Sequence, residues 1–345
     1  MGRSKGSSMP PRAPFSRGGI VAMYVVLAVA LAAACLAGVV CGSSSVDAGD
    51  VWALASGGEL SQKAHAILVN VRLPRVAAAV LAGAALAVSG ALIQAVLDNP
   101  LASPNVMGIN AGAGLAVLAC SAAFPEAFRL LPLAAFCGAL VAAAVVFAVA
   151  ARAGMSKTAV VLAGVALAAV FGAGMNTVLI VDPDAYVGSS GFLVGGLSGV
   201  LLDSILWPAL YILVGGIAAA ALSGRLNVLS LGDASAHAVG MRVGAFRFVA
   251  LAVAALLAGA AVSFAGLLGF VGLIVPHLVR FFFGHDARRV VPASALAGAF
   301  FVVACDLFAR VAFAPYEVPV GIVMAFLGGP FFIYLIVKRR GGYGG

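Results

Sequence analysis

RLPRVAAAVLAGAALAVSGALIQAVLDNP, residues 72–100, is an apolar segment with two arginines at one end and an Asp-Asn-Pro sequence at the other. As an α-helix, Pro74 to Leu97 would be roughly 36 Å long at 1.5 Å per residue. That length crosses a hydrocarbon core of about 30 Å. The segment therefore predicts a membrane-spanning helix that starts at Arg72 and Arg75 and stops at a polar break, Asn99-Pro100.

The composition of the whole chain points the same way. Of its 345 residues, 63% are hydrophobic and 9% are charged, whereas soluble proteins carry about 25% charged residues. So few charges cannot cover a water-facing surface, which predicts an all-α integral membrane protein. The net charge of +8 is typical of basic cytoplasmic loops, and it does not indicate nucleic-acid binding.

Apolar runs bounded by charged and turn residues predict about ten transmembrane helices in a single polytopic domain, residues 20–338. Residues 188–199 are apolar but rich in Gly and Ser, and we expect a short surface helix there. The division between the seventh and eighth spans, within residues 263–272, stays open. The predicted spans are residues 20–41, 74–97, 106–123, 130–151, 158–181, 203–222, 247–265, 269–283, 291–312 and 318–337.

The positive-inside rule sets the orientation of these spans. With the N-terminus in the cytoplasm, most Lys and Arg residues fall inside, and an even number of spans returns the basic C-terminus to the same side. Residues 1–19 and 339–345 are then cytoplasmic tails. The basic residues left outside are Lys63, Arg72, Arg75, Arg129 and Arg310.

The chain lacks the motifs of an enzyme or of an ATPase. It has no phosphate-binding G-x-x-x-x-G-K-[ST] sequence, no Ser/His/Asp set and no His/Cys cluster with metal-ligand spacing. Few ionisable residues lie at mid-membrane depth, where ion-coupled transporters place them. We therefore expect no catalytic residue, no metal and no bound cofactor in this chain, and a separate ATPase subunit that uses ATP.

Several motifs in order resemble the FecCD-like permease subunits of type II ABC importers, from about residue 71 to residue 336. They are R-L-P-R (72–75), N-P-L-A-S-P (99–104), L-A-G-V-A-L (162–167), L-G-D-A-S-A-H-A-V-G (231–240), G-F-V-G-L-I-V-P-H-L-V-R (269–280), D-L-F-A-R (306–310) and E-V-P-V-G-I-V-M-A-F-L-G-G-P-F-F (317–332). Each motif alone is weakly specific. Together they imply the ten-helix fold of that family.

The resemblance implies that Arg72, Arg75 and Arg310 receive carboxylates from an extracytoplasmic binding protein. Arg72 and Arg75 are three residues apart and would share a helix face. Asp306 lies one helical turn before Arg310 and can pair with it. An arginine fork suits a carboxylate because it binds in a bidentate way. The alternative is that these side chains only snorkel to the membrane interface.

Two loops correspond to the cytoplasmic gate of similar permeases. The first follows the break at Asn99-Pro100 and includes Leu101, since proline disfavours an α conformation in the residue before it. The second precedes the fifth span and contains Ser156 and Thr158. As an alternative, both are ordinary connecting turns.

The polar stretch between Arg225 and Arg247 corresponds to the loop that contacts the ATPase in similar permeases. We expect a short helix over residues 234–239, with Asp233 as its cap and Gly240 as its stop. An ordinary amphipathic loop is the alternative. The residues assigned to ATPase coupling are Leu231, Gly232, Asp233, Ala234, Ala236 and Gly240.

The sequence thus predicts the permease of an importer in the bacterial cytoplasmic membrane. Its expected partners are membrane lipid, a second permease copy or close homologue, two ATPase subunits and an extracytoplasmic binding protein. A ferric siderophore is the leading cargo by resemblance, followed by haem and cobalamin, and no residue discriminates among them. The rival functions are a stand-alone secondary transporter or channel, and a membrane scaffold without transport.

Overall fold

The computed structural model describes residues 17–42, 48–58 and 60–340, and within these ranges the regular structure is helical throughout. Each of the ten predicted spans is a helix. Among the described residues, seven helical segments are long and apolar enough to cross a membrane, and three apolar helices are shorter. The long segments are α1 (Arg17–Val40), Gln62–Leu97, α6 (Leu131–Arg152), α7 (Lys157–Val181), α9 (Leu202–Leu229), α11 (Val243–Ala265) and α13 (Ala287–Val311). The shorter ones are α5 (Ile109–Ala123), α12 (Val271–Phe283) and α14 (Val320–Arg340).

Short helices fill the connections. The expected surface helix near residues 188–199 is α8 (Asp184–Val194), which begins four residues earlier. The others are α2 (Ala48–Ser56), α10 (Asp233–Ala238) and the single turns η2 (Pro104–Met107) and η3 (Phe128–Leu130). The predicted N-terminal tail lies outside the described residues up to residue 16, and α14 continues to Arg340, so most of the predicted C-terminal tail also lies outside them.

The helix predicted to start at Pro74 starts earlier. A continuous helical segment runs from Gln62 to Leu97 and contains α3 (Gln62–Ile67), the π-helical turn η1 (Leu68–Arg72) and α4 (Leu73–Leu97). Pro74 has no N–H and its ring clashes with the carbonyl one turn before it. A wide π turn at this place relieves that conflict without ending the helix. Arg72 and Arg75 therefore lie inside a long helix and not at its start.

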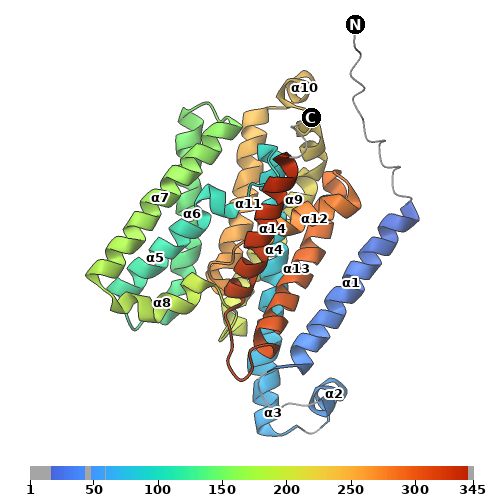
Figure 1. Ribbon diagram of the computed structural model, residues 1–345, viewed down its shortest axis with the longest axis vertical. Helices are drawn as coiled ribbons and strands as arrows, with labels where there is room; N and C mark the ends of the chain where they lie inside the picture. The colour runs from blue at the N-terminus through green and yellow to red at the C-terminus, as the bar shows by residue number, and fades with distance from the viewer. Residues whose placement is uncertain (1–16, 43–47, 59, 341–345) are drawn as a thin grey trace.

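The central helix of the bundle is α4, with α11 and α13 beside it (Figure 1). Side chains along α4, such as Leu92 and Ile93, are fully buried. Helices α5 to α8 form one flank, and α1 lies alone on the other side against α13 (Figure 1). We call the end that carries α10 the α10 end, and the end that carries α3 the Arg75 end. Helix α1 begins and α14 ends towards the α10 end (Figure 1).

Glycine allows the central helices to approach each other closely. A methyl group at Gly83 would overlap the backbone of Gly298 in α13, and one at Gly90 would overlap the backbone of Gly272 in α12. In a membrane, lipid tails are as apolar as the helix surfaces, so helices associate by such close packing. These two contacts fix α4 against α13 and α12.

We predict that Gly90→Ala lowers the stability of the folded protein by about 1–3 kcal/mol, the usual effect of an overpacked site. The control is Gly216→Ala in α9, where an added methyl group meets nothing within 4 Å. Both changes raise helix propensity equally, so the difference isolates packing. Thermal unfolding in detergent measures both variants, and equal melting temperatures would contradict the packing argument.

Candidate functional site

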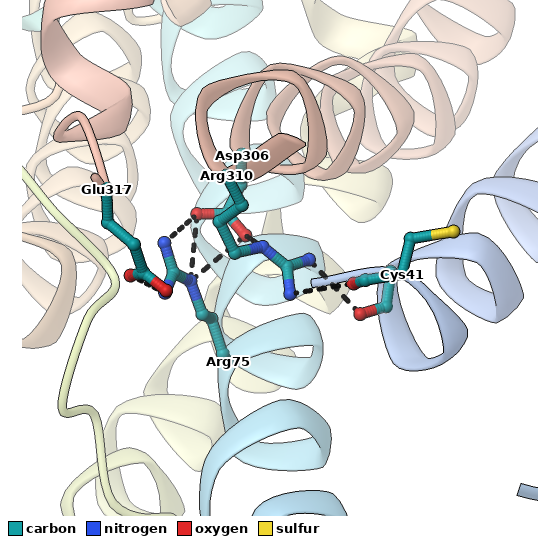
Figure 2. Close-up of polar contacts among 6 residues, drawn as sticks. Cys41, Arg75, Asp306, Arg310 and Glu317 are labelled. Carbon is teal, nitrogen blue, oxygen red and sulfur yellow. Dashed lines mark hydrogen bonds and ion pairs between the residues drawn. The ribbon is translucent and has the colours of Figure 1, made fainter. Parts of the chain in front are cut away.

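A buried carboxylate organises the Arg75 end. Asp306 in α13 is 2% exposed. It accepts hydrogen bonds from Arg75 Nε at 3.0 and 3.1 Å, and Arg75 Nη2 lies 3.0 Å from the same carboxylate. Arg310, one turn further along α13, forms an ion pair with the other side, with Nε 3.1 Å from Asp306 Oδ2. The expected pairing of Asp306 with Arg310 is therefore present, and Asp306 also joins α13 to α4 (Figure 2).

A second carboxylate reaches Arg75 from the opposite side. Arg75 Nη1 donates to Glu317 Oε2 at 2.6 Å, and the Glu317 side chain is 33% exposed (Figure 2). Glu317 precedes α14, in a non-helical connection that runs from Ala312 to Pro319. Arg75 and Glu317 both line a cavity of about 840 Å³, to which Arg129, Asp203 and Ser198 also contribute. Of the described carboxylates on Arg75, the one on the cavity side is therefore Glu317.

Arg72 and Arg310 bind the C-terminal end of α1. Arg72 Nη1 donates to the carbonyl oxygens of Val39 at 2.8 Å and Val40 at 2.7 Å. Arg310 donates to the carbonyl of Gly38 at 3.1 Å and to that of Cys41 at 3.4 Å (Figure 2). The last carbonyls of a helix have no partner within the helix and carry partial negative charge. Two arginines from neighbouring helices supply these partners, and so fix an otherwise lightly packed helix.

The predicted docking arginines thus form one cluster, but they do not form an exposed surface. Arg72 is 3% exposed, Arg75 5% and Arg310 3%. Arg72 donates to carbonyls of α1, whereas Arg75 donates to the two carboxylates, despite their helical spacing. Within this cluster, the three guanidinium groups and the carboxylates of Asp306 and Glu317 leave one net positive charge. Their role in docking stays a prediction, and of the three only Arg75 lines the cavity beside Glu317.

At the α10 end, the structure brings the two predicted gate loops together. Helix α4 ends at Leu97, as expected, and Asp98 follows in the left-handed conformation with φ 50°. The Asn99 side chain accepts a hydrogen bond from the Leu101 N–H at 3.0 Å, and this bond closes a turn with Pro100 at its centre. Lys157 Nζ lies 3.1 Å from Asp98 Oδ2. This ion pair joins the loop after α4 to the start of α7.

The second gate loop has a local structural role as well. Ser156 caps α7, because its Oγ accepts the Ala159 N–H at 3.1 Å, and Thr158 is exposed in the first turn.

A cavity of about 500 Å³ lies beside the loop after α4, and its lining includes Asn99, Pro100 and Arg280. Gln94 in the last turn of α4 donates to the carbonyl of Gly272 at 3.1 Å and accepts a hydrogen bond from Arg280. Both interactions tie α4 to α12 next to the predicted gate.

The expected short helix of the coupling segment is present as α10, one residue earlier than predicted. The prediction that Asp233 caps it is wrong. The capping residue is Gly232, with φ 97°, and the Asp233 carboxylate instead accepts hydrogen bonds from Arg247 of α11 at 2.7 and 2.9 Å. A buried arginine is the stronger partner for this carboxylate, since the hydrogen bonds from Arg247 Nη2 to its two oxygens are charge-assisted.

This ion pair fixes α10 while leaving its outer surface free. Ala236 is fully buried against the bundle, whereas Ala234 and Gly240 are exposed and Leu231 is 71% exposed. Helix α9 continues through Arg225 to Leu229, so the connection is shorter than the predicted polar stretch. Arg225 is exposed at the helix surface, and a long basic side chain there does not end a helix.

A polar contact next to α10 holds the end of α9 to the start of α13. Asn227 donates to Asp286 Oδ1 at 2.6 Å, and its own oxygen accepts the Ala287 N–H at 2.7 Å. Burial alone would raise the pKa of Asp286, but the hydrogen bonds from Asn227 and from the Arg288 N–H, with the nearby arginines, outweigh it and hold the pKa below its ordinary value. The carboxylate therefore stays ionised as the cap of α13.

Sequence reasoning did not assign a role to four residues that contact the predicted sites, Asp98, Lys157, Gln94 and Arg280, nor did it pair Glu317 with Arg75. Asp98 precedes the Asn-Pro break and Lys157 lies between two assigned residues, so their opposite charges were a visible signal. Nothing local indicates that Glu317 reaches a residue 242 positions away. Within the described residues, no group of three or more His, Cys, Asp or Glu side chains could hold a metal ion.

The protein is a bundle of apolar helices that has a buried arginine cluster at one end and an exposed short helix at the other. This architecture is that of a multi-pass transport permease of the cytoplasmic membrane. The chain matches the model of the FecCD transport family over residues 29–338, and it belongs to that family.

Similar proteins carry consistent descriptions. The chain is 38% identical to the Fe(3+)-citrate import system permease protein YfmE of Bacillus subtilis, over 78% of this chain and 81% of the relative. It is 37% identical to the hemin transport system permease protein HmuU of Yersinia pestis (79% and 84%). It is 39% identical to the cobalamin import system permease protein BtuC of Halobacterium salinarum (81% and 75%). A solved structure described as an inward-facing metal-chelate type ABC transporter superimposes with a TM-score of 0.82 at 25% identity, over 92% of this chain and 99% of that one.

We predict that Asp306→Asn destabilises the protein by about 3–5 kcal/mol, because it leaves two buried guanidinium groups without their shared counter-charge. The control is Glu126→Gln, which removes an exposed carboxylate and should change stability by no more than about 0.5 kcal/mol. The measurement is the thermal unfolding midpoint in detergent. Similar midpoints for the two variants would show that Asp306 is not a structural centre.

Proposed function

We propose that this chain is the membrane-spanning permease of an ABC importer for a bulky iron chelate. It passes the chelate from an extracytoplasmic binding protein to the cytoplasm, and a separate ATPase subunit supplies the energy. The chain itself binds no cofactor. The relatives support an import permease through their descriptions, which name iron-citrate, hemin and cobalamin.

The observation that carries the proposal is the placement of two different contact elements at opposite ends of one rigid bundle. The Arg75 end has a cavity of about 840 Å³ whose lining includes Arg75 and Arg129, and these guanidinium groups suit the carboxylates of an acidic protein partner. The α10 end exposes a short helix that is fixed from behind by the pair of Asp233 and Arg247. We therefore assign the Arg75 end to the outside and the α10 end to the cytoplasm, which puts the start of α1 and the end of α14 on the cytoplasmic side.

Helix α10 is the proposed contact with the ATPase. A helix that transmits motion needs an exposed face for its partner and a firm connection to the bundle, and α10 has both. The loops joined by Asp98 and Lys157 lie at the same end, so we propose that they form the gate of the translocation path. Two copies of the chain, or this chain and a close homologue, would enclose that path between them.

A ferric siderophore is the proposed cargo, with haem and cobalamin next. The relatives named above carry chelates of different chemistry at similar identity. Size and shape are what these cargoes share. We infer a wide path lined by small apolar side chains, in which a bulky solute is held without tight contacts, and in which ATP shifts the balance between two states.

The proposal is tested by reconstitution. Proteoliposomes that contain the permease with its ATPase, plus the binding protein loaded with a radioactive ferric chelate, should accumulate iron only when ATP is supplied on the ATPase side. The control contains the permease alone with an imposed proton or sodium gradient. Uphill uptake in that control would favour a secondary transporter, and the absence of ATP-driven uptake of any of the three cargo classes would overturn the proposal.

We further predict that Leu231→Ala weakens association of the permease with its ATPase by about tenfold, since an exposed apolar anchor beside α10 is lost. The matched control is Phe124→Ala, which removes an apolar side chain that is 59% exposed in a connection outside α10. Pull-down titration of the ATPase measures both. If the two variants bind the ATPase equally well, α10 is not the contact.

A further inference from the structure

Arg75 lies between two carboxylates that differ in how deeply they are buried. Asp306 binds it from inside the bundle, is 2% exposed and also pairs with Arg310. Glu317 binds Nη1 from the cavity, with a side chain that is 33% exposed (Figure 2). Removing Asp306 would take the buried counter-charge from Arg75 and Arg310 at the same time. Glu317 can leave at far lower cost, because its carboxylate can return to water.

We propose that Glu317 is a built-in substitute for the carboxylate of the binding protein. In the free permease it occupies the edge of Arg75 that faces the cavity, and docking exchanges it for an acidic side chain of the partner. The inference rests on the proposed docking function and names the residue through which docking acts. It also explains how a guanidinium that is 5% exposed can serve as a docking site.

Electrostatics favour such an exchange. One carboxylate replaces another, so Arg75 keeps two negative partners and no buried charge is left unpaired at the end of the step. Any difference in affinity then comes from how well each carboxylate fits the guanidinium fork. Glu317 competes with the partner for Arg75. The apparent affinity of the partner is therefore its intrinsic affinity multiplied by the fraction of free permease molecules in which Glu317 has released Arg75.

The exchange has a structural consequence for α14. Glu317 lies three residues before this helix, and its ion pair ties the start of α14 to α4. Two other contacts hold the helix on its inner side. The Gly321 N–H donates to the Gly195 carbonyl at 3.0 Å, and Gly328 packs against the ring of Phe270. On its outer side Phe326 is 77% exposed. Release of Glu317 therefore loosens the start of a lightly packed helix.

The test uses the complete transporter in nanodiscs, with wild type, Glu317→Gln and Asp203→Asn compared. The probe is the binding protein that copurifies with the tagged transporter, produced recombinantly. Asp203 is exposed and lines the same cavity, but it forms no ion pair with Arg75 in the described chain. Both variants lose one negative charge there, so their difference reports on the contact with Arg75 and not on general repulsion of an acidic partner.

Glu317→Gln should bind the binding protein roughly tenfold more tightly than wild type, the factor expected if Glu317 holds Arg75 in about nine of ten free molecules. Asp203→Asn should change the affinity much less. Without binding protein, Glu317→Gln should also show faster hydrogen exchange over residues 316–322, since the anchor of α14 is weakened. Wild type should reach similar exchange rates there only after docking.

A further variant separates this inference from the proposed docking function. Arg75→Lys keeps the charge beside Asp306 but loses the bidentate fork, and it should weaken docking. If Arg75→Lys docks normally, the docking function fails. If Arg75→Lys weakens docking while Glu317→Gln and Asp203→Asn have equal affinities, only the exchange is wrong. Unchanged hydrogen exchange in free Glu317→Gln would likewise overturn the link to α14.

Discussion

The buried carboxylate of Asp306 is the interaction on which the Arg75 end depends. It orients Arg75 of α4 and Arg310 of its own helix at the same time. Arg310 in turn binds the end of α1, and Arg75 binds Glu317 at the entrance to α14. Asp306 thus orients two arginines that each contact a peripheral helix, α1 through Arg310 and α14 through the pair of Arg75 with Glu317. Within a membrane such a group is costly to bury, so its retention here is explained by the number of elements that it connects.

Core and periphery are held together by different forces. Between α4 and its neighbours α12 and α13, glycine lets the backbones touch, so close packing acts along the middle of these helices. Polar contacts of Arg75 with Asp306 and of Gln94 with α12 are added near the two ends of α4. Helices α1, α10 and α14 instead attach through charged or polar groups at their ends. Close packing tolerates little displacement, whereas an ion pair that lines a cavity, such as that of Arg75 with Glu317, can exchange partners.

The sequence predicts the periodic part of this structure well. The ten apolar segments, the end of α4 at Leu97 and the short helix α10 follow from composition, an Asn-Pro break and a flanking glycine. Prediction from the sequence fails where contacts between residues far apart in the chain determine the local structure. The cap of α10 was assigned to Asp233 by local rules, but Arg247 takes that carboxylate. The π turn before Pro74 and the pair of Arg75 with Glu317 depend on tertiary packing, which a single sequence does not encode locally.

The division of the bundle also limits where motion can occur. Helix α4 carries Arg75 at one end and Gln94 and Asp98 at the other, so it connects the proposed docking and gate sites directly. Its glycine contacts leave no space to slide against α12 or α13. Transport therefore requires that α4 moves as one body with those helices, or that it stays still while lightly packed helices move around it. The second arrangement places the moving parts at α7, which is joined to α4 by the exposed pair of Asp98 and Lys157, and at α14, which is joined to it by Glu317. Each of these links is an exchangeable ion pair, so a partner at either end can shift the balance between states without repacking the core.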